Sequence, residues 1–121
     1  MSWEQVEKKL WDGSVLRDIV IDEEDAVVYM DILSGGGDRL ICRECIGISY
    51  LGRWSEMMIN CVRVFDKHPL LKETQDILRR NNSPCTMRRC LRDVQNDFRV
   101  VTIVLTDGVQ VNIICADAYI K

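Results

Sequence analysis

The sequence predicts one α+β domain over residues 1–121, with two helices packed on one face of an antiparallel sheet of about six strands. Two segments have apolar residues at helical spacing, and six show the alternation typical of strands. Asp107-Gly108, between two apolar runs, is the strongest hairpin signal in the chain. A chain of 121 residues can bury one core but is too short for two. Its 47% apolar and 29% charged residues exclude a disordered or fibrous protein.

The first expected element is a short amphipathic helix at residues 3–11. Trp3, Val6 and Leu10 recur at helical spacing, and Gly13 is a natural stop. Two strands, LRDIVI and AVVYMDIL, then flank the acidic run DEED at residues 22–25. The pattern predicts a hairpin with a tight polar turn.

The middle of the chain predicts a loop, two further strands and a second helix. The run SGGGD at residues 34–38 lacks the lysine of a P-loop, so we interpret it as a hairpin loop. Strands are expected at residues 39–50 and 57–65. HPLLKETQDILRRNN then changes to helical spacing, with Pro69 in the first turn. Its apolar stripe is Leu70, Leu71, Thr74, Ile77 and Leu78.

The last two strands should form a hairpin around a two-residue turn at Asp107-Gly108. That turn pairs Val104 with Val111 and Thr102 with Ile113, so these residues would share one largely apolar face. The opposite face would mix apolar residues with Gln110 and Asn112. A hairpin of this composition is expected inside the sheet or against a partner.

The stretch LICRECIGISY at residues 40–50 raises the question of a metal site, because Cys42 and Cys45 are three residues apart. A zinc knuckle turns the chain so that both thiolates reach one metal. In a strand, residues three apart point to opposite faces, and the alternation here favours a half-buried strand. No second ligand pair has a standard spacing, so we predict no metal and no cofactor. Without a secretion signal, most of the six cysteines are interpreted as buried apolar groups or free thiols.

His68 is the only histidine in the chain, so acid-base chemistry near neutral pH would depend on it or on a perturbed carboxylate. It directly precedes Pro69 at the start of the second helix, where a capping role is favoured over catalysis. We therefore expect a protein that is not an enzyme. A thiol-dependent enzyme, with a cysteine close to His68, is the third hypothesis.

Five arginines form a basic cluster within 14 residues. Guanidinium groups suit phosphates and carboxylates, so the cluster is a candidate anion-binding site, although an ordinary solvated surface is the favoured interpretation. It contains no stacking aromatic residue and the chain is acidic overall, so no nucleic-acid partner is expected. The five residues are Arg79, Arg80, Arg88, Arg89 and Arg92.

Charge is distributed unevenly along the chain. Residues 1–60 contain 12 acidic and 6 basic residues, whereas residues 61–121 contain 7 acidic and 10 basic residues. Such polarity steers a charged partner toward one face, although folding can also interleave these charges on an ordinary surface. The acidic run lacks the glycine and distal glutamate of a calcium loop. Its functional interpretation is a partner-binding surface made of Asp18, Asp22, Glu23, Glu24, Asp25 and Asp31.

The opening WEQVEKKLWDGSVLRDIVI resembles small cytoplasmic bacterial proteins, among them the immunity proteins of polymorphic toxin systems. The resemblance implies a protein that blocks a toxin at its active site or at an exosite. No apolar run approaches the roughly 18 residues of a membrane span, and the charged N-terminus is unlike a signal peptide, so a cytoplasmic location is expected.

The leading functional hypothesis is a non-catalytic protein-binding module, specifically an immunity-like inhibitor that docks its acidic surface on a basic protein. The alternative is a self-assembling structural or accessory domain that forms a homodimer through a sheet edge or face. Neither hypothesis involves a membrane.

Overall fold

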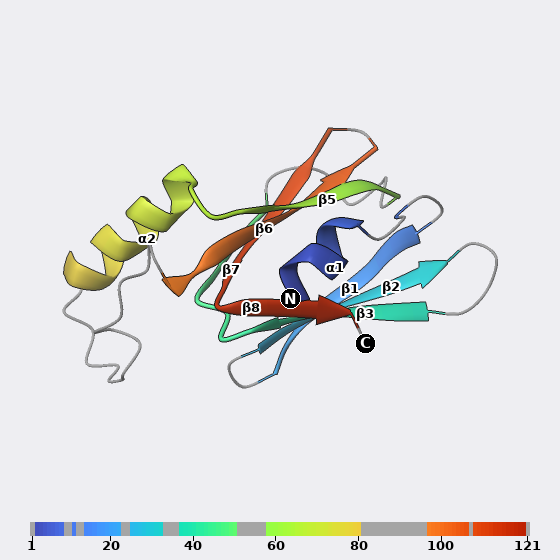
Figure 1. Ribbon diagram of the computed structural model, residues 1–121, viewed down its shortest axis with the longest axis horizontal. Coiled ribbons are helices and arrows are strands. Elements are labelled where there is room, and N and C mark those ends of the chain that lie inside the picture. The colour runs from blue at the N-terminus through green and yellow to red at the C-terminus, as the bar shows by residue number, and fades with distance from the viewer. Residues whose placement is uncertain are drawn as a thin grey trace.

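Two antiparallel sheets of four strands each form the framework of the protein (Figure 1). The computed structural model describes residues 2–8, 11, 14–22, 25–32, 37–50, 58–80, 97–106 and 108–120. The first sheet has the strand order β1-β2-β3-β8 and the second has the order β4-β7-β6-β5. The strands are β1 (Ser14–Asp22), β2 (Asp25–Ile32), β3 (Gly37–Arg43), β4 (Gly47–Tyr50), β5 (Ile59–Phe65), β6 (Arg99–Leu105), β7 (Gln110–Cys115) and β8 (Asp117–Ile120).

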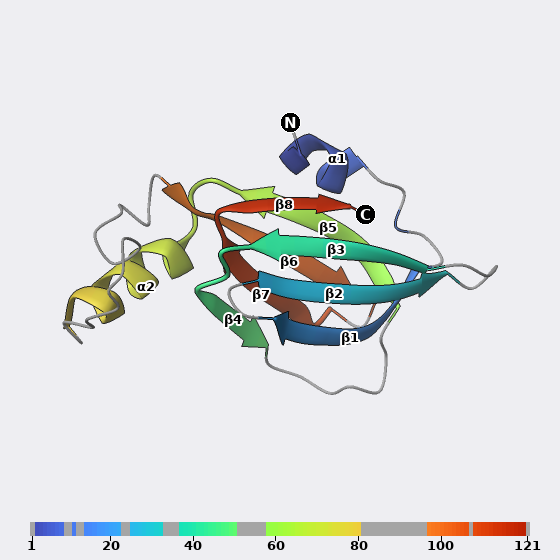
Figure 2. The same cartoon turned by 90° about the horizontal axis from the view of Figure 1, so that it is seen from below.

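The two sheets face each other because two neighbouring chain segments bend from one sheet into the other (Figure 2). Three residues separate β3 from β4, and Ala116 alone separates β7 from β8. At this bend Glu44 has a φ of 52°, and the Ala116 N–H donates to the Arg43 carbonyl at 2.9 Å. The expected single strand at residues 39–50 is therefore two strands in two sheets.

The α+β class and the antiparallel pairing agree with the prediction, but the prediction of one sheet with both helices on one face is wrong. A flat sheet leaves apolar residues on two faces to be covered, whereas a bent pair of sheets buries one face of each against the other. The main core lies between the sheets and includes the inward residues of β6 and β7. They are Val101, Ile103, Leu105, Val111, Ile113 and Cys115.

Helix α1 (Ser2–Lys8) lies against β8 of one sheet and β5 of the other, as both views show (Figures 1 and 2). Trp3 and Val6 are buried in the main core, and Trp11, just beyond the helix, donates its Nε1 proton to the Val6 carbonyl at 2.9 Å. The expected helix at residues 3–11 is confirmed in its first two turns. Leu10 lies outside the described residues.

Helix α2 (Pro69–Arg80) has the predicted bounds but not the predicted position. It stands at one end of the second sheet, where Leu71 packs with Phe98, Val100 and Ile114 in a second, smaller core. Ile77 of the expected apolar stripe is 48% exposed, because the helix projects beyond the sheet (Figure 1). No helix in the described part of the chain is long and apolar enough to cross a membrane.

The β6–β7 hairpin is present, but its register differs from the prediction by one residue. Leu105 donates to the Val109 carbonyl, so three residues rather than two separate the paired positions. Gly108 has a φ of +91° and donates to the Leu105 carbonyl, as in a three-residue loop whose glycine adopts a left-handed conformation. A one-residue slip moves every β6 side chain to the opposite face relative to β7. Thr102 consequently pairs with Asn112 rather than with Ile113.

Candidate functional site

The predicted acidic surface falls on the β1–β2 hairpin, and the structure brings only part of it together. Asp22 pairs with Asp25 at one end of the hairpin, and Asp18 lies four residues back along β1. Asp31 pairs with Val15 at the other end, roughly 20 Å from Asp25 at the usual rise per strand residue. Glu23 and Glu24 lie outside the described residues. The acidic end of the hairpin thus consists of Asp18, Asp22 and Asp25.

Strand β1 is the outer strand of its sheet, with β2 on one side. On its other side, the pairing found within the described ranges is an isolated bridge between Val15 and Met58. The next positions toward the acidic end expose apolar side chains, with Val20 39% and Ile21 57% accessible. Asp18 is exposed, and its Oδ1 accepts a hydrogen bond from the Ile19 N–H at 2.8 Å.

The other outer strands differ from β1 because each is short or covered. Helix α1 lies against both β5 and β8, and Glu7 Oε2 accepts a hydrogen bond from the Val64 N–H of β5 at 3.1 Å. Strand β4 has four residues. Unpaired strand edges bind other strands, and proteins usually shorten, charge or cover them. The free edge of β1, residues 16–22, is therefore the long uncovered edge among the described strands.

The sequence could not locate this edge. Hydrophobic alternation predicts a strand but does not determine which strands flank it, and pairing across the sheet is decided by the whole fold. The neighbouring charged residues Arg17 and Asp18 were an available signal, since both are exposed and lie at a bulge in the β1–β2 ladder between Leu16 and Asp18. Bulges and charges of this kind are frequent on edge strands.

Cys42 and Cys45, the pair that suggested a metal knuckle, separate at the bend. Cys42 is buried in the core, whereas Cys45 follows the end of β3 and donates its thiol proton to the Gly47 carbonyl at 3.6 Å. The described residues contain no cluster of three or more His, Cys, Asp or Glu that could hold a metal. Cys85 and Cys90 lie outside them, so the absence of zinc stays a prediction.

Cys42 instead meets Cys115 of β7 across the core. A hydrogen bond with Cys42, burial, and the charge of Asp117 raise the pKa of the Cys115 thiol far above its usual range. Both side chains are fully buried and both cysteines are free. Both therefore act as apolar core residues, as the sequence suggested for most of the cysteines. The Cys115 thiol is protonated.

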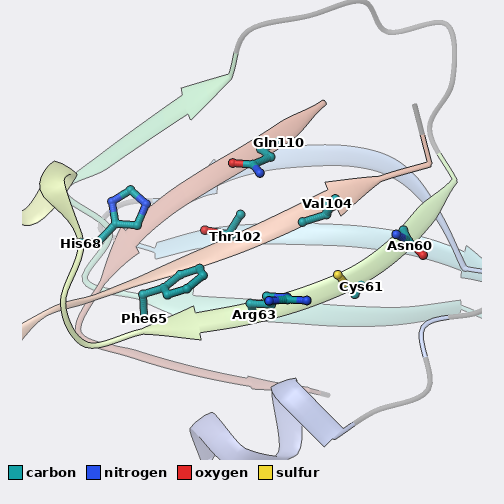
Figure 3. A pocket seen from close by; sticks show the side chains of 8 residues that line it. All are labelled: Asn60, Cys61, Arg63, Phe65, His68, Thr102, Val104 and Gln110. Carbon is teal, nitrogen blue, oxygen red and sulfur yellow. The ribbon is translucent and has the colours of Figure 1, made fainter. Parts of the chain in front are cut away.

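His68 has the predicted capping role at α2. Its Nδ1 accepts a hydrogen bond from the Leu70 N–H at 3.1 Å, and its carbonyl accepts one from the Leu71 N–H at 3.0 Å. The ring lies 5.5 Å from that of Phe65. Cys61 lines the same surface pocket, but Figure 3 shows it at the end opposite His68. Nucleophilic catalysis needs the two groups within hydrogen-bond reach, and Cys61 and His68 do not form such a pair here.

The arginine cluster is described only in part. Arg79 and Arg80 are the last two residues of α2. Arg88, Arg89 and Arg92 lie outside the described residues. Anion binding by this cluster stays a prediction.

Comparison with known proteins adds no assignment to this geometry. No protein-family model, no curated protein and no solved structure matches the chain. The edge of β1, the acidic end of its hairpin and the surfaces around them are therefore the features that bear on function.

Proposed function

We propose that this protein is a non-catalytic binding module that docks on a basic segment of another protein through the free edge of β1 and the acidic end of its hairpin. The observation that supports this most directly is the uncovered edge itself, which has two exposed aliphatic side chains, Val20 and Ile21, between Asp18 and Asp22. An immunity-like inhibitor of a basic toxin, as implied by the N-terminal resemblance, is the specific form that we propose.

The edge favours an extended segment as its occupant. An added strand satisfies the unpaired N–H and C=O groups of β1 and provides affinity, and its side chains provide specificity. Exposed aliphatic groups would supply apolar contact at the same place. The acids at positions 18, 22 and 25 favour lysine or arginine in that segment, and their field speeds the encounter.

A second copy of the chain is the alternative occupant, and charge weighs against it. If two β1 strands paired antiparallel about Val20, Asp18 of each copy would lie opposite Asp22 of the other. Like charges directly opposite each other destabilise a pair of strands. A homodimer through this edge would therefore need a different register.

The proposal can be tested with a photo-crosslinking residue introduced in the native cell. Placed at Ile21 it should yield a discrete adduct with a basic protein, whereas placed at Ile77, an exposed isoleucine on α2, it should not. Combining the probe at Ile21 with Asp18→Asn, Asp22→Asn and Asp25→Asn should reduce that adduct several-fold. A matched control, Asp66→Asn with Glu73→Gln and Asp76→Asn, removes three exposed acids elsewhere and should leave it unchanged.

With the crosslinked protein purified, its association rate should fall as ionic strength rises and should fall again in the triple variant, because charges screened by salt steer the encounter. The melting temperature of the variant should stay within a degree or two, since exposed charges contribute little to folding. Equal adducts at both positions, or an association rate insensitive to salt and to the three substitutions, would contradict the proposal. An adduct with a second copy would favour the self-assembling domain.

A further inference from the structure

A pocket lies on the outer face of the second sheet, away from β1. Its volume is about 310 Å³, and its walls come from β5, β6 and β7 and from the residue that precedes α2. Figure 3 shows Arg63 near its middle, with Cys61 on one side and Phe65 on the other along β5. The lining residues are Asn60, Cys61, Arg63, Phe65, His68, Thr102, Val104 and Gln110.

The register explains why these side chains gather there. A bulge between Ile59 and Cys61 directs Val62 into the core and places Cys61 and Arg63 on the opposite face. Cys61 pairs with Val104, and Arg63 pairs with Thr102. Because the β6–β7 loop has three residues, Thr102 and Val104 also belong to this outer face rather than to the core.

The described walls of the pocket are positive and include no acidic residue. None of its eight lining residues is acidic, and the guanidinium of Arg63 is permanently charged. No carboxylate in the described part of the chain pairs with Arg63. The N-terminus of α2, which begins directly after His68, adds the positive end of a helix dipole.

Several polar groups of the pocket besides Arg63 can donate a hydrogen bond. His68 accepts the Leu70 N–H at Nδ1, so its neutral ring keeps a proton on Nε2. Thr102, a residue that is 3% exposed, already donates its hydroxyl proton to Asn112 Oδ1 at 2.7 Å, so it supplies no donor to a ligand. The side-chain amides of Asn60 and Gln110 provide further donors. Phe65 and Val104 provide apolar surface beside them.

We propose that this pocket binds a small organic anion, with its carboxylate or phosphate group held by Arg63 and its apolar body against Phe65 and Val104. A positive, donor-rich pocket with one apolar wall is suited to that chemistry. The site is separate from the β1 edge, so it stands whether or not the proposed protein partner exists.

Cys61 allows a direct test, because its thiol lines the pocket two residues from Arg63. Iodoacetate is itself a small carboxylate, and iodoacetamide is its neutral counterpart. With either reagent the Cys61 thiolate attacks the CH₂ carbon, a C–S bond forms, the C–I bond breaks and iodide leaves, while the thiol proton passes to buffer. Both rates depend equally on the fraction of Cys61 that is ionised, so their ratio is independent of that fraction. The ratio therefore measures how strongly the pocket attracts the anionic reagent, iodoacetate.

The iodoacetate-to-iodoacetamide rate ratio, measured by peptide mass spectrometry, should be about three- to fivefold higher at Cys61 than at Cys45, as expected for an exposed ion pair. Arg63→Gln should bring the ratio at Cys61 down to that at Cys45. Arg39→Gln removes an exposed arginine from β3 in the other sheet, away from both cysteines, and should change the ratio at neither. Equal ratios at Cys61 and Cys45 in the unaltered protein would overturn the proposal.

Competition identifies the head group and tests the apolar contact. Benzoate or phenyl phosphate at millimolar concentration should slow iodoacetate at Cys61 and leave Cys45 unaffected, and whichever protects more strongly names the preferred head group. Inorganic phosphate should protect several-fold less. Protection by inorganic phosphate equal to that by phenyl phosphate would overturn the role of Phe65 and Val104, and no protection by any of the three would overturn the site.

Discussion

The thiols of Cys42 and Cys115 are opposed in the core, where one strand of each sheet contributes a cysteine. Neither residue forms a disulfide, and the pKa of Cys115 is raised first by the hydrogen bond with Cys42 and then by burial. The native state therefore keeps the Cys115 proton at pH values where an unfolded chain releases it. Stability and alkaline pH are linked through this residue.

Unfolding free energy should consequently fall as pH rises above the ordinary thiol pKa of 9.0. Below that pH both states keep the proton, and the stabilising contribution of Cys115 is fully present. Above it only the unfolded state loses the proton, which lowers the unfolding free energy by at most about 1.4 kcal/mol per pH unit. Urea unfolding under reducing conditions from pH 8 to 10.5 measures the slope. Cys115→Ala should flatten it and Cys61→Ala should not, and a slope unchanged by Cys115→Ala would contradict this account.

At the scale of elements, the β6–β7 hairpin shows how one loop residue determines two surfaces. The three-residue loop directs Val101, Ile103 and Leu105 into the core and leaves Thr102 and Val104 for the pocket. The Asp-Gly signal correctly located the hairpin, but it is compatible with two-residue and three-residue loops. The apolar inner face, complete only in the observed register, is what selects the longer loop.

Gly108 should be required for this loop, because its φ of +91° disfavours any residue with a Cβ. The space around its Cβ position is open, so the cost of substitution comes from backbone strain rather than a clash. Gly108→Ala should lower the unfolding free energy by about 1 kcal/mol in urea titrations. Gly108→Asn should lower it less, since asparagine tolerates this region better. Equal stabilities of glycine and alanine would show that the loop tolerates another conformation.

At the scale of the whole molecule, α1 packs against an outer strand of each sheet. Its residues contact β8 and β5, Val6 is fully buried between them, and Arg99 of β6 lies over the Trp3 ring at 5.1 Å. An isolated bridge between Val15 and Met58 joins the sheets at another point. The helix is thus part of the core that both sheets share, and among the described strands it leaves β1 as the uncovered edge.

Val6→Ala should therefore destabilise the molecule by about 2 kcal/mol, because it removes two buried methyl groups from a site that cannot collapse freely. Glu4→Ala, on the exposed face of the same helix, should change stability by less than about 0.5 kcal/mol. Tryptophan fluorescence and far-ultraviolet circular dichroism should give coincident urea transitions for both variants. If Val6→Ala had no effect, or if the two probes separated in the unaltered protein, α1 would not belong to the common core.

The candidate sites were predictable only in their chemistry. The acidic hairpin and the capping role of His68 follow from local sequence, because turns and caps are determined by residues a few positions apart. The pocket around Arg63 was not found, since its walls come from residues at positions 60–68 and 102–110, brought together by the β5–β6–β7 pairing. No local pattern signals such a site.

The sequence by itself determined the α+β class, the antiparallel strands up to the bend, the bounds of α2 and the location of the last hairpin, since periodicity and turn chemistry act over short distances. Only the tertiary structure decided that the strand at residues 39–50 bends at Glu44 and divides between two sheets, that α1 covers two edges, and that β1 is left open. These features depend on which apolar faces meet across the core, and burial is a property of the assembled chain rather than of any segment.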